Sequence, residues 1–482
     1  MSANSVSIAL QSRSLRRTGG SVLRIGASAL ITAFAFGMVF GGLVSWDFLS
    51  FLVACTMFVS ALVMARPFFG AAAIADKKAF LSSTLMIWIF LMASEGIFVH
   101  AGSTSSAASG NFAAGAYFEA GSWILCFAAL AIISCSRPGY LKGLFAGPLK
   151  WTSIFAVIAV LSCPLSPGPA YSLAQAFKLC VVVLTLFAVN GVADGMKSIA
   201  AVFGALFTGT LLLSIAGFLA PFLGPGQIFN GTRFGAVIGL SGTAGILLIL
   251  SLLFWLLKKS LWFLVAAVFS LVLMIMVGGK GGIVASVFSL LMFLILLKKA
   301  GQALVACAAF VVTFLLLVAF TPVGNTLQTY GASSNTSTLS GRTDLWNAVW
   351  PEIRQRPIFG HGYRASRFVS SEVEGAFAEA GHIHNAFLEI LYNNGVAGLL
   401  PILVLNFITV RNLWPVLKRP PTLQWRYYAA TAFALWVHLL LWGVTAPTFG
   451  STADSRFMTF FSILLVSVYL RAQAVPKTKF AL

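Results

Sequence analysis

Long apolar segments separated by short polar stretches fill most of this chain of 482 residues. About 20 apolar residues in a helix span the hydrocarbon core of a bilayer, so each segment is a candidate transmembrane helix. The pattern therefore predicts an all-α, polytopic membrane helix bundle with about fourteen spans. These spans are expected near 22–45, 48–65, 79–99, 117–134, 151–166, 172–190, 199–220, 235–256, 261–277, 281–297, 303–321, 395–410, 428–444 and 456–470.

Lysine and arginine in the short loops predict the orientation, because cytoplasmic loops carry the excess of positive charge. With the N-terminus inside, the inside loops hold 22 of the 31 basic residues, and the reverse orientation fails at almost every loop. Both termini are therefore predicted to be cytoplasmic. The expected parts are a tail at 1–21, about eleven spans over 22–321, a large outer loop at 322–394, about three spans over 395–471 and a second tail at 472–482.

Composition supports the same class. The chain is 59% hydrophobic and 9% charged, whereas a soluble domain carries about 25% charged residues. A net charge of +19 would indicate nucleic acid in a soluble protein, but here the cytoplasmic loops account for it, so we expect membrane lipids and no nucleic acid as partners. The six cysteines lie in or beside apolar segments without a CxxC pattern, which supports neither a disulfide framework nor a thiolate metal site.

Polar chemistry is concentrated between Ser340 and Leu400. This stretch reads SGRTDLWNAVWPEIRQRPIFGHGYRASRF, then an acidic patch, then GHIHNAFLEILYNNGVAGLLP. It contains three of the five histidines, half of the acidic residues and five arginines. We interpret it as the functional centre. Within it, a short helix is expected through Trp350, ended or kinked by Pro351. A second amphipathic stretch is expected from His384 through Tyr392, broken at 393–395 before the next span.

The histidines leave three interpretations open. His382 and His384 are two residues apart, so an extended segment directs both to one side. They could ligate zinc, although His361, Glu379 and Glu389 are the only further ligands nearby. They could instead bond the backbone in a structural role. The interpretation we favour is a general base, because histidine titrates near neutral pH.

Three cations from distant parts of the chain, Arg233, Lys280 and Arg342, are predicted to reach the outer face. An anionic substrate, especially a diphosphate, would explain them. The alternative is contact with lipid headgroups or with acidic residues of the loop. Lys178 lies near the outer end of its span, where snorkelling to the interface is the default expectation.

The motifs RFGAVIGLSGTAG, GGKGGIVAS, SGRTDLWNAVWPEIRQRPIFGHGYRASRF and HIHNAFLEILYNNGVAGLL resemble the bacterial O-antigen ligase/polymerase superfamily, over roughly residues 172–410. The resemblance implies a GT-C-like bundle in the bacterial inner membrane, with the outer loop in the periplasm. It implies transfer of a glycan from undecaprenyl diphosphate to a hydroxyl of a glycan or lipid A-core acceptor, without metal or other cofactor. The products would be surface polysaccharides such as O-antigen or exopolysaccharide.

The resemblance also implies roles for the cations. Arg233 matches the family's outer-face arginine before a spanning helix, and Arg342 matches the GR motif of its loop. Lys280 stands where many relatives have arginine, and glycines replace the serines of that motif. All three would bind the diphosphate and stabilise its charge as it leaves.

His384 of the HxHN motif matches the family's proposed base, and His382 is the second catalytic candidate. A hydroxyl is a poor nucleophile until a base takes its proton. Asp344, Asn385 and Glu389 are the candidates for orienting the imidazole ring.

The role within the family remains open between a polymerase, which joins lipid-linked repeats, and a ligase, which moves finished glycan onto lipid A-core. The alternative class is a transporter (flippase) of polysaccharide or lipid-linked oligosaccharide. A transporter is expected to carry charged or broken helices near the bilayer midplane. The spans here are nearly free of acids and the polar residues gather on one side, which favours the enzyme over a transporter or a scaffold.

Overall fold

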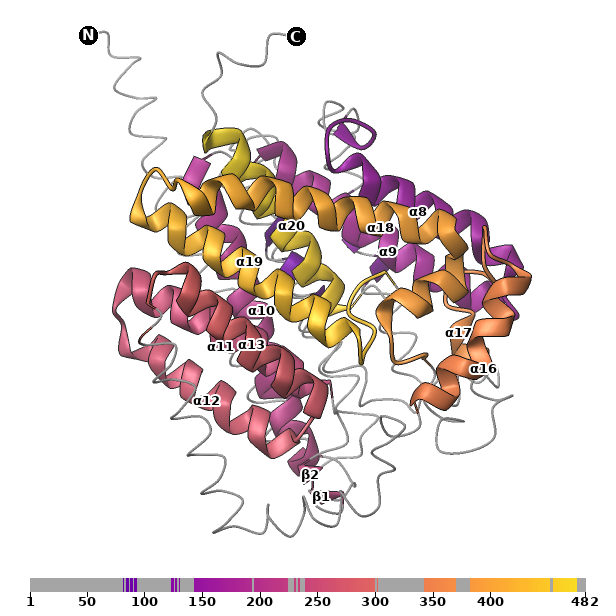
Figure 1. The fold of residues 1–482 in the computed structure, drawn as a ribbon, viewed down its shortest axis with the longest axis horizontal. Helices are drawn as coiled ribbons and strands as arrows, with labels where there is room; N and C mark the ends of the chain where they lie inside the picture. Colours follow the sequence, from indigo (N-terminus) through magenta and orange to yellow (C-terminus); the bar gives the residue numbers. More distant parts are fainter. Residues whose placement is uncertain are drawn as a thin grey trace, which may run out of the picture.

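A computed structural model (Figure 1) describes residues 143–192, 195–223, 229–230, 233–234, 239–299, 301, 342–369, 382–450 and 454–474, with isolated positions between 81 and 130. The predicted spans near 22–45, 48–65 and 303–321 lie outside these residues. Of those near 79–99 and 117–134, only the isolated positions are described, and they are helical.

Apolar helices make up the bundle, as predicted. Five described helices are long and apolar enough to cross a membrane. They are α9 (Pro169–Val192), α10 (Gly195–Leu223), α11 (Leu240–Lys258), α18 (Ala386–Lys418) and α20 (Ser455–Ala474). The other apolar helices are α8 (Lys150–Ser162), followed by the 3-10 turn η2 (Cys163–Leu165), α12 (Leu261–Val277), α13 (Lys280–Leu296) and α19 (Leu423–Gly443). The chain is a multi-pass membrane protein, and the total of fourteen spans remains a prediction.

The described part is helical apart from one small hairpin. Its strands, β1 (Phe229–Asn230) and β2 (Arg233–Phe234), pair antiparallel with Asn230 opposite Arg233. The hairpin contacts α12 and lies at one end of the bundle (Figure 1).

Two groups of helices meet along α19. One group contains α11, α12 and α13, and α13 packs along both α11 and α19. The other centres on α18, which packs against α8, α19 and α20 (Figure 1). The long α18 therefore connects the polar segment beside α16 (Arg342–Gln355) to the membrane core.

Small residues let α11, α13 and α19 approach closely. A Cβ on Gly282 would lie 2.6 Å from the backbone nitrogen of Gly242, and one on Gly245 would collide with Ser286 and His438. Close backbone approach through small residues is the usual means of packing helices in membranes. The glycines around Lys280 therefore position the start of α13 by packing, whatever else they do.

The helix α16 covers a small apolar core of its own. Leu345, Val349 and Ile353 are buried on one side of it and pack against Ala365, Ile383 and Tyr392. Of the two effects expected of Pro351, the end of the helix was wrong, because α16 continues to Gln355. The carbonyl that proline leaves without a donor belongs to exposed Asn347, where water can satisfy it.

The break predicted at 393–395 is found at Gly395 alone, and a loop fills it. Gly395 has φ +60° and ψ −162° inside α18. The Tyr392 and Asn393 carbonyls accept from the amides of His361 and Gly362, at 2.9 and 2.8 Å. On the other side of the break, the amides of Val396 and Ala397 donate to the carbonyls of Pro357 and Ile358, at 2.8 and 3.0 Å. The loop thus replaces the hydrogen bonds that the helix loses.

We expect Gly395→Ala to destabilise the fold by about 2 to 4 kcal/mol, because this backbone conformation is essentially restricted to glycine. The added Cβ would also collide with the Ile358 carbonyl. Thermal unfolding in detergent would measure the loss. The matched control is Gly204→Ala in α10, where a Cβ meets nothing within 4 Å. Equal stability of the two variants would contradict the proposed role of the break.

Candidate functional site

The predicted histidine pair lies together at the start of α18. His384 has a left-handed backbone with φ +57°, which turns the chain into the helix. The rings of His382 and His384 have centroids 3.9 Å apart and are inclined by 65°. Between them, the carbonyl of Ile383 accepts a 3.0 Å hydrogen bond from Nε1 of Trp346 in α16. The two imidazoles are therefore held by both helices.

Both histidines are held neutral by their surroundings. Burial, and then the charge of Arg342, lower the pKa of His384 to about 4. Burial and the neighbouring His384 lower the pKa of His382 well below its ordinary 6.5, and Arg456, Arg364 and Arg342 add to this shift. Cations disfavour a second positive charge nearby, so a neutral imidazole is the stable form at pH 7. Such an imidazole can accept a proton.

Arg342 is the predicted cation whose positive charge lowers the pKa of both His382 and His384. It is the first residue of α16 and is half-buried, and this burial lowers the pKa of its guanidinium. A partly desolvated cation is stabilised by an anion. The site is therefore suited to bind a negatively charged group beside His384.

Lys280 is linked to the same site through one turn. It is the exposed first residue of α13, and a Cβ on the adjacent Gly281 would collide with Thr445. Hydrogen bonding to the backbone of Thr445 partly offsets the lowered pKa of His384. The side-chain amide nitrogen Nδ2 of Asn385 donates to the carbonyl of Val444, the residue before Thr445, at 3.4 Å. The turn at 444–445 thus joins the start of α13 to the histidine segment.

The remaining predicted residues have different positions. Arg233 lies in strand β2, and its side chain is outside the described part of the structure. Asp344 is exposed on α16. The side-chain oxygen of Asn385 caps α18, accepting from the amides of Phe387 and Leu388 at 3.0 Å each. Asn385, a candidate for orienting the ring of His384, therefore uses its side-chain oxygen as a helix cap.

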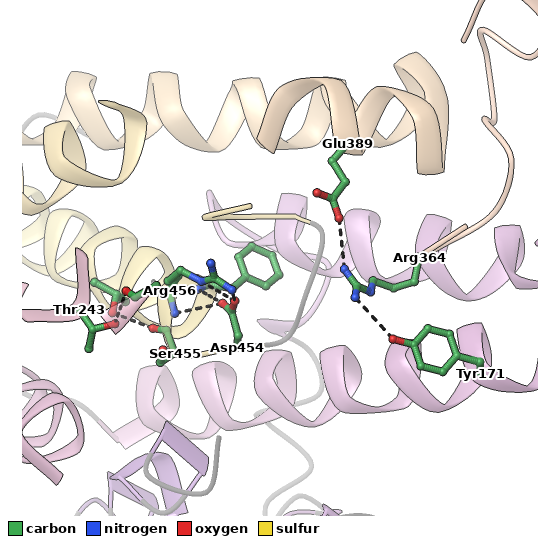
Figure 2. Close-up of polar contacts among 10 residues, drawn as sticks. Tyr171, Thr243, Arg364, Glu389, Asp454, Ser455 and Arg456 are labelled. Carbon is green, nitrogen blue, oxygen red and sulfur yellow. Dashed lines mark hydrogen bonds and ion pairs between the residues drawn. The ribbon is translucent and has the colours of Figure 1, made fainter. Parts of the chain in front are cut away.

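Glu389 is fully buried and forms an ion pair with Arg364, whose Nη1 lies 3.2 Å from its Oε1 (Figure 2). The same oxygen accepts from the hydroxyl of Ser366 at 3.1 Å. On its other side, Nη2 of Arg364 lies 3.5 Å from the hydroxyl of Tyr171 in α9. This network fixes the loop after α16 to α18 and α9, and it commits one oxygen of the Glu389 carboxylate to partners other than the histidines.

Besides Arg342, a second cation lies at the site. It is Arg456, near the start of α20, and it was not among the cations predicted from the sequence. Its Nε donates to Oδ2 of Asp454 at 2.6 Å, and its guanidinium lies 5.5 Å from the centre of the Trp442 ring. It contributes to the lowered pKa of His382. The rule that singled out Arg233 and Lys280, a charge at the outer end of a predicted span, applies equally to Asp454 and Arg456 and would have found them.

The third histidine of the stretch is occupied elsewhere. Nε2 of His361 lies 3.0 Å from the carbonyl of Glu352, and its ring stacks on Tyr392 with centroids 4.5 Å apart. Among the described residues, no three histidine, cysteine or acidic side chains are grouped so that they could hold a metal ion. Glu379, a ligand candidate in the zinc interpretation, lies outside the described residues.

These features define a multi-pass membrane protein with a cation-flanked histidine pair at the ends of its helices. Residues 265–403 match the family model described as O-antigen ligase. Exopolysaccharide production protein ExoQ of Rhizobium meliloti (strain 1021) is 33% identical over 131 residues, a match that covers 26% of this chain and 29% of that relative. The chain thus aligns with less than a third of the relative's length. Both findings support the predicted resemblance to the O-antigen ligase/polymerase superfamily.

The matched stretch includes Lys280, Arg342 and both histidines of the pair. It ends in α18 shortly after Gly395, so it also contains the break and the loop that fills it. Arg233 and Arg456 lie outside it. The descriptions of the family and of the relative refer to O-antigen ligation and to exopolysaccharide production, and the activity of this chain is a proposal.

We expect Arg364→Met to lower the free energy of unfolding by about 3 to 5 kcal/mol, because it leaves the buried Glu389 carboxylate without its cation. The double variant Arg364→Met/Glu389→Gln should lose less, since it removes the uncompensated charge. Thermal or denaturant unfolding of both variants, and of Glu389→Gln alone, tests this coupling. Arg354→Met, at an exposed position of α16, is the control. A double variant as unstable as the sum of the two single variants would contradict the ion pair.

Proposed function

We propose that this protein transfers a glycan from a polyprenyl diphosphate to an acceptor hydroxyl at the site around His382 and His384. The observation that carries the proposal is the placement of two neutral imidazoles beside the cationic Arg342 and Arg456. A glycosyl transfer of this kind needs a base at the acceptor and positive charge at the leaving group. Undecaprenyl diphosphate is the carrier we propose, in the bacterial inner membrane.

The chemistry follows as a single displacement. Neutral His384 takes the proton of the acceptor hydroxyl while the hydroxyl oxygen bonds to the anomeric carbon. The bond from that carbon to the phosphate oxygen breaks, and its electron pair leaves with the diphosphate. Arg342, Arg456 and Lys280 stabilise the developing negative charge, and Arg233 is a further candidate. Attack opposite the leaving group inverts the anomeric centre.

The support for an enzyme over a transporter is the distribution of charge. The one acidic residue within the described apolar helices is Glu389, near the start of α18, where it is paired with Arg364. A transporter is expected to place charge or broken backbone near the midplane. The break at Gly395 lies instead at the start of the span predicted at 395–410 and is filled by the loop.

We expect His384→Asn to reduce glycan transfer by about two or more orders of magnitude, because it removes the base. Asparagine tolerates the left-handed backbone at this position, so the fold should be kept. The assay uses reconstituted protein, a polyprenyl-diphosphate glycan donor and two acceptors. His361→Phe, which preserves stacking on Tyr392, is the matched control and should retain transfer.

The acceptors separate the two family roles. Extension of a second lipid-linked repeat indicates a polymerase, and labelling of lipid A-core indicates a ligase. If wild type uses neither acceptor with a cognate donor, the enzyme proposal fails and transport becomes the better explanation. If His384→Asn transfers as well as wild type, His384 is not the base.

The lowered pKa of His384 predicts an unusual pH profile. In the free enzyme the base is lost only as pH falls through about 4, so kcat/KM should keep its acid limb near that value. The negative charge of a bound diphosphate should raise the pKa of His384, so the limb of kcat should lie at higher pH. Arg342→Gln removes a cation and should move the kcat/KM limb upward. A kcat/KM limb near 6.5 in wild type would contradict the assigned environment.

A further inference from the structure

Two large apolar side chains are exposed on the loop that fills the break in α18. Ile358 is 62% exposed and Phe359 is 59% exposed. The loop is held at both ends, because the carbonyls of Pro357 and Ile358 accept hydrogen bonds from α18 and the amide of Gly360 donates to the carbonyl of Arg356 at 3.0 Å. The two side chains are therefore a fixed apolar feature of the surface.

This feature continues an apolar stripe of α18. Val396, Leu400, Leu403 and Phe407 are exposed by 46 to 64% and recur at spacings of four, three and four residues. Such spacing places them on one face of a helix. Because α18 is a candidate membrane span, that face is suited to contact lipid acyl chains. The loop residues lie where the stripe begins, since the carbonyl of Ile358 bonds to the amide of Ala397.

The helix α16 adds an aromatic residue and cations. Trp350 is 41% exposed, although the opposite face of α16 is buried. The guanidinium of Arg354, one turn later, lies 5.9 Å from the centre of the Trp350 ring. Arg354 and Arg356 are both exposed. Tryptophan beside arginine is typical of the membrane–water interface, where the ring sits at headgroup level and the guanidinium reaches lipid phosphates.

We propose that Trp350, Ile358 and Phe359 form an interfacial anchor that inserts into the lipid headgroup region, with Arg354 and Arg356 bound to lipid phosphates. Two observations identify lipid as the occupant. The loop side chains continue a stripe on a membrane-spanning helix, and the flanking charges are complementary to phosphate. This inference concerns the membrane and does not depend on the proposed glycan transfer.

The anchor would have a consequence for the site. Trp350 is one turn beyond Trp346, which bonds the carbonyl between the two histidines, and α16 begins at Arg342. Fixing α16 to the headgroup region would thus hold Arg342 and the histidine segment at a constant depth. A lipid-linked donor carries its diphosphate at the headgroup level of the same leaflet.

The two tryptophans of α16 allow a matched test. Full-length protein is reconstituted in bilayers whose lipids carry bromine, a fluorescence quencher, on the acyl chain near the headgroup. Subtracting the spectrum of Trp350→Phe from that of wild type isolates the emission of Trp350. The same subtraction with Trp346→Phe isolates the half-buried Trp346, which is the control.

The anchor predicts strong quenching of Trp350 fluorescence in these bilayers. The quenching should be weaker when the bromines lie near the ends of the lipid acyl chains. The Trp346 signal should be lost much less. Equal quenching of the two tryptophans, or no quenching of Trp350, would overturn the anchor. No quenching of Trp350 is the result expected if a protein partner covers this surface instead of lipid. Because both variants keep an aromatic ring in α16, cooperative thermal unfolding of each checks that the fold is intact.

A second measurement tests the arginines. Brominated phosphatidylglycerol should quench Trp350 more strongly than brominated phosphatidylcholine, because it is anionic. Replacement of both Arg354 and Arg356 by glutamine should remove that difference. Equal quenching by the two lipids in the wild-type protein would overturn the assignment of phosphate binding to these arginines.

Discussion

The break in α18 is the constraint on which the described structure depends. Backbone amides and carbonyls that lose their helical partners are costly near lipid, so a break in a membrane helix requires replacement donors and acceptors. Residues 357–362 supply four of them. The loop cannot leave without exposing those groups, and it is therefore part of the bundle. Its next residues, Tyr363 and Arg364, enter the interior, where the amide of Tyr363 donates to Ser162 at the end of α8 at 3.1 Å.

The cations of the site, together with burial, keep its histidines neutral. Within the described residues, Arg364 and Arg456 each form an ion pair with a carboxylate, whereas Arg342 forms none there. Burial and then the cationic field lower the histidine pKa values, which keeps both imidazoles neutral. A bound diphosphate would reduce that field. Base strength would then rise when the donor is present, which restricts proton removal to the loaded enzyme.

Sequence reasoning predicted most of the helices, because hydropathy alone locates a membrane span. Observed α12 (Leu261–Val277) coincides with its predicted range, and the HxH pair does lie together. Patterns along the chain could not reveal partners that only folding brings together. Arg364 and Glu389 are 25 residues apart without a shared period, and the Ser162 that binds the loop precedes it by about 200 residues. Helix boundaries were predicted less accurately, since α18 begins eight residues before the predicted end of the outer loop at 394.

The short first part of α18 explains why the site and the break belong together. At one end, Asn385 caps the helix directly after the left-handed His384. At the other end, Gly395 breaks it and receives the loop. Between them, the buried face holds Glu389, which binds Arg364 and Ser366, while the Asn393 amide oxygen accepts from the backbone of Ser366 at 2.8 Å. The segment is less than three turns long and is fixed at both ends and along one face, so a displacement of the loop at the break must also move His384. Accurate placement of a base needs such support, because a catalytic group that shifts by about 1 Å can lose about two orders of magnitude in rate.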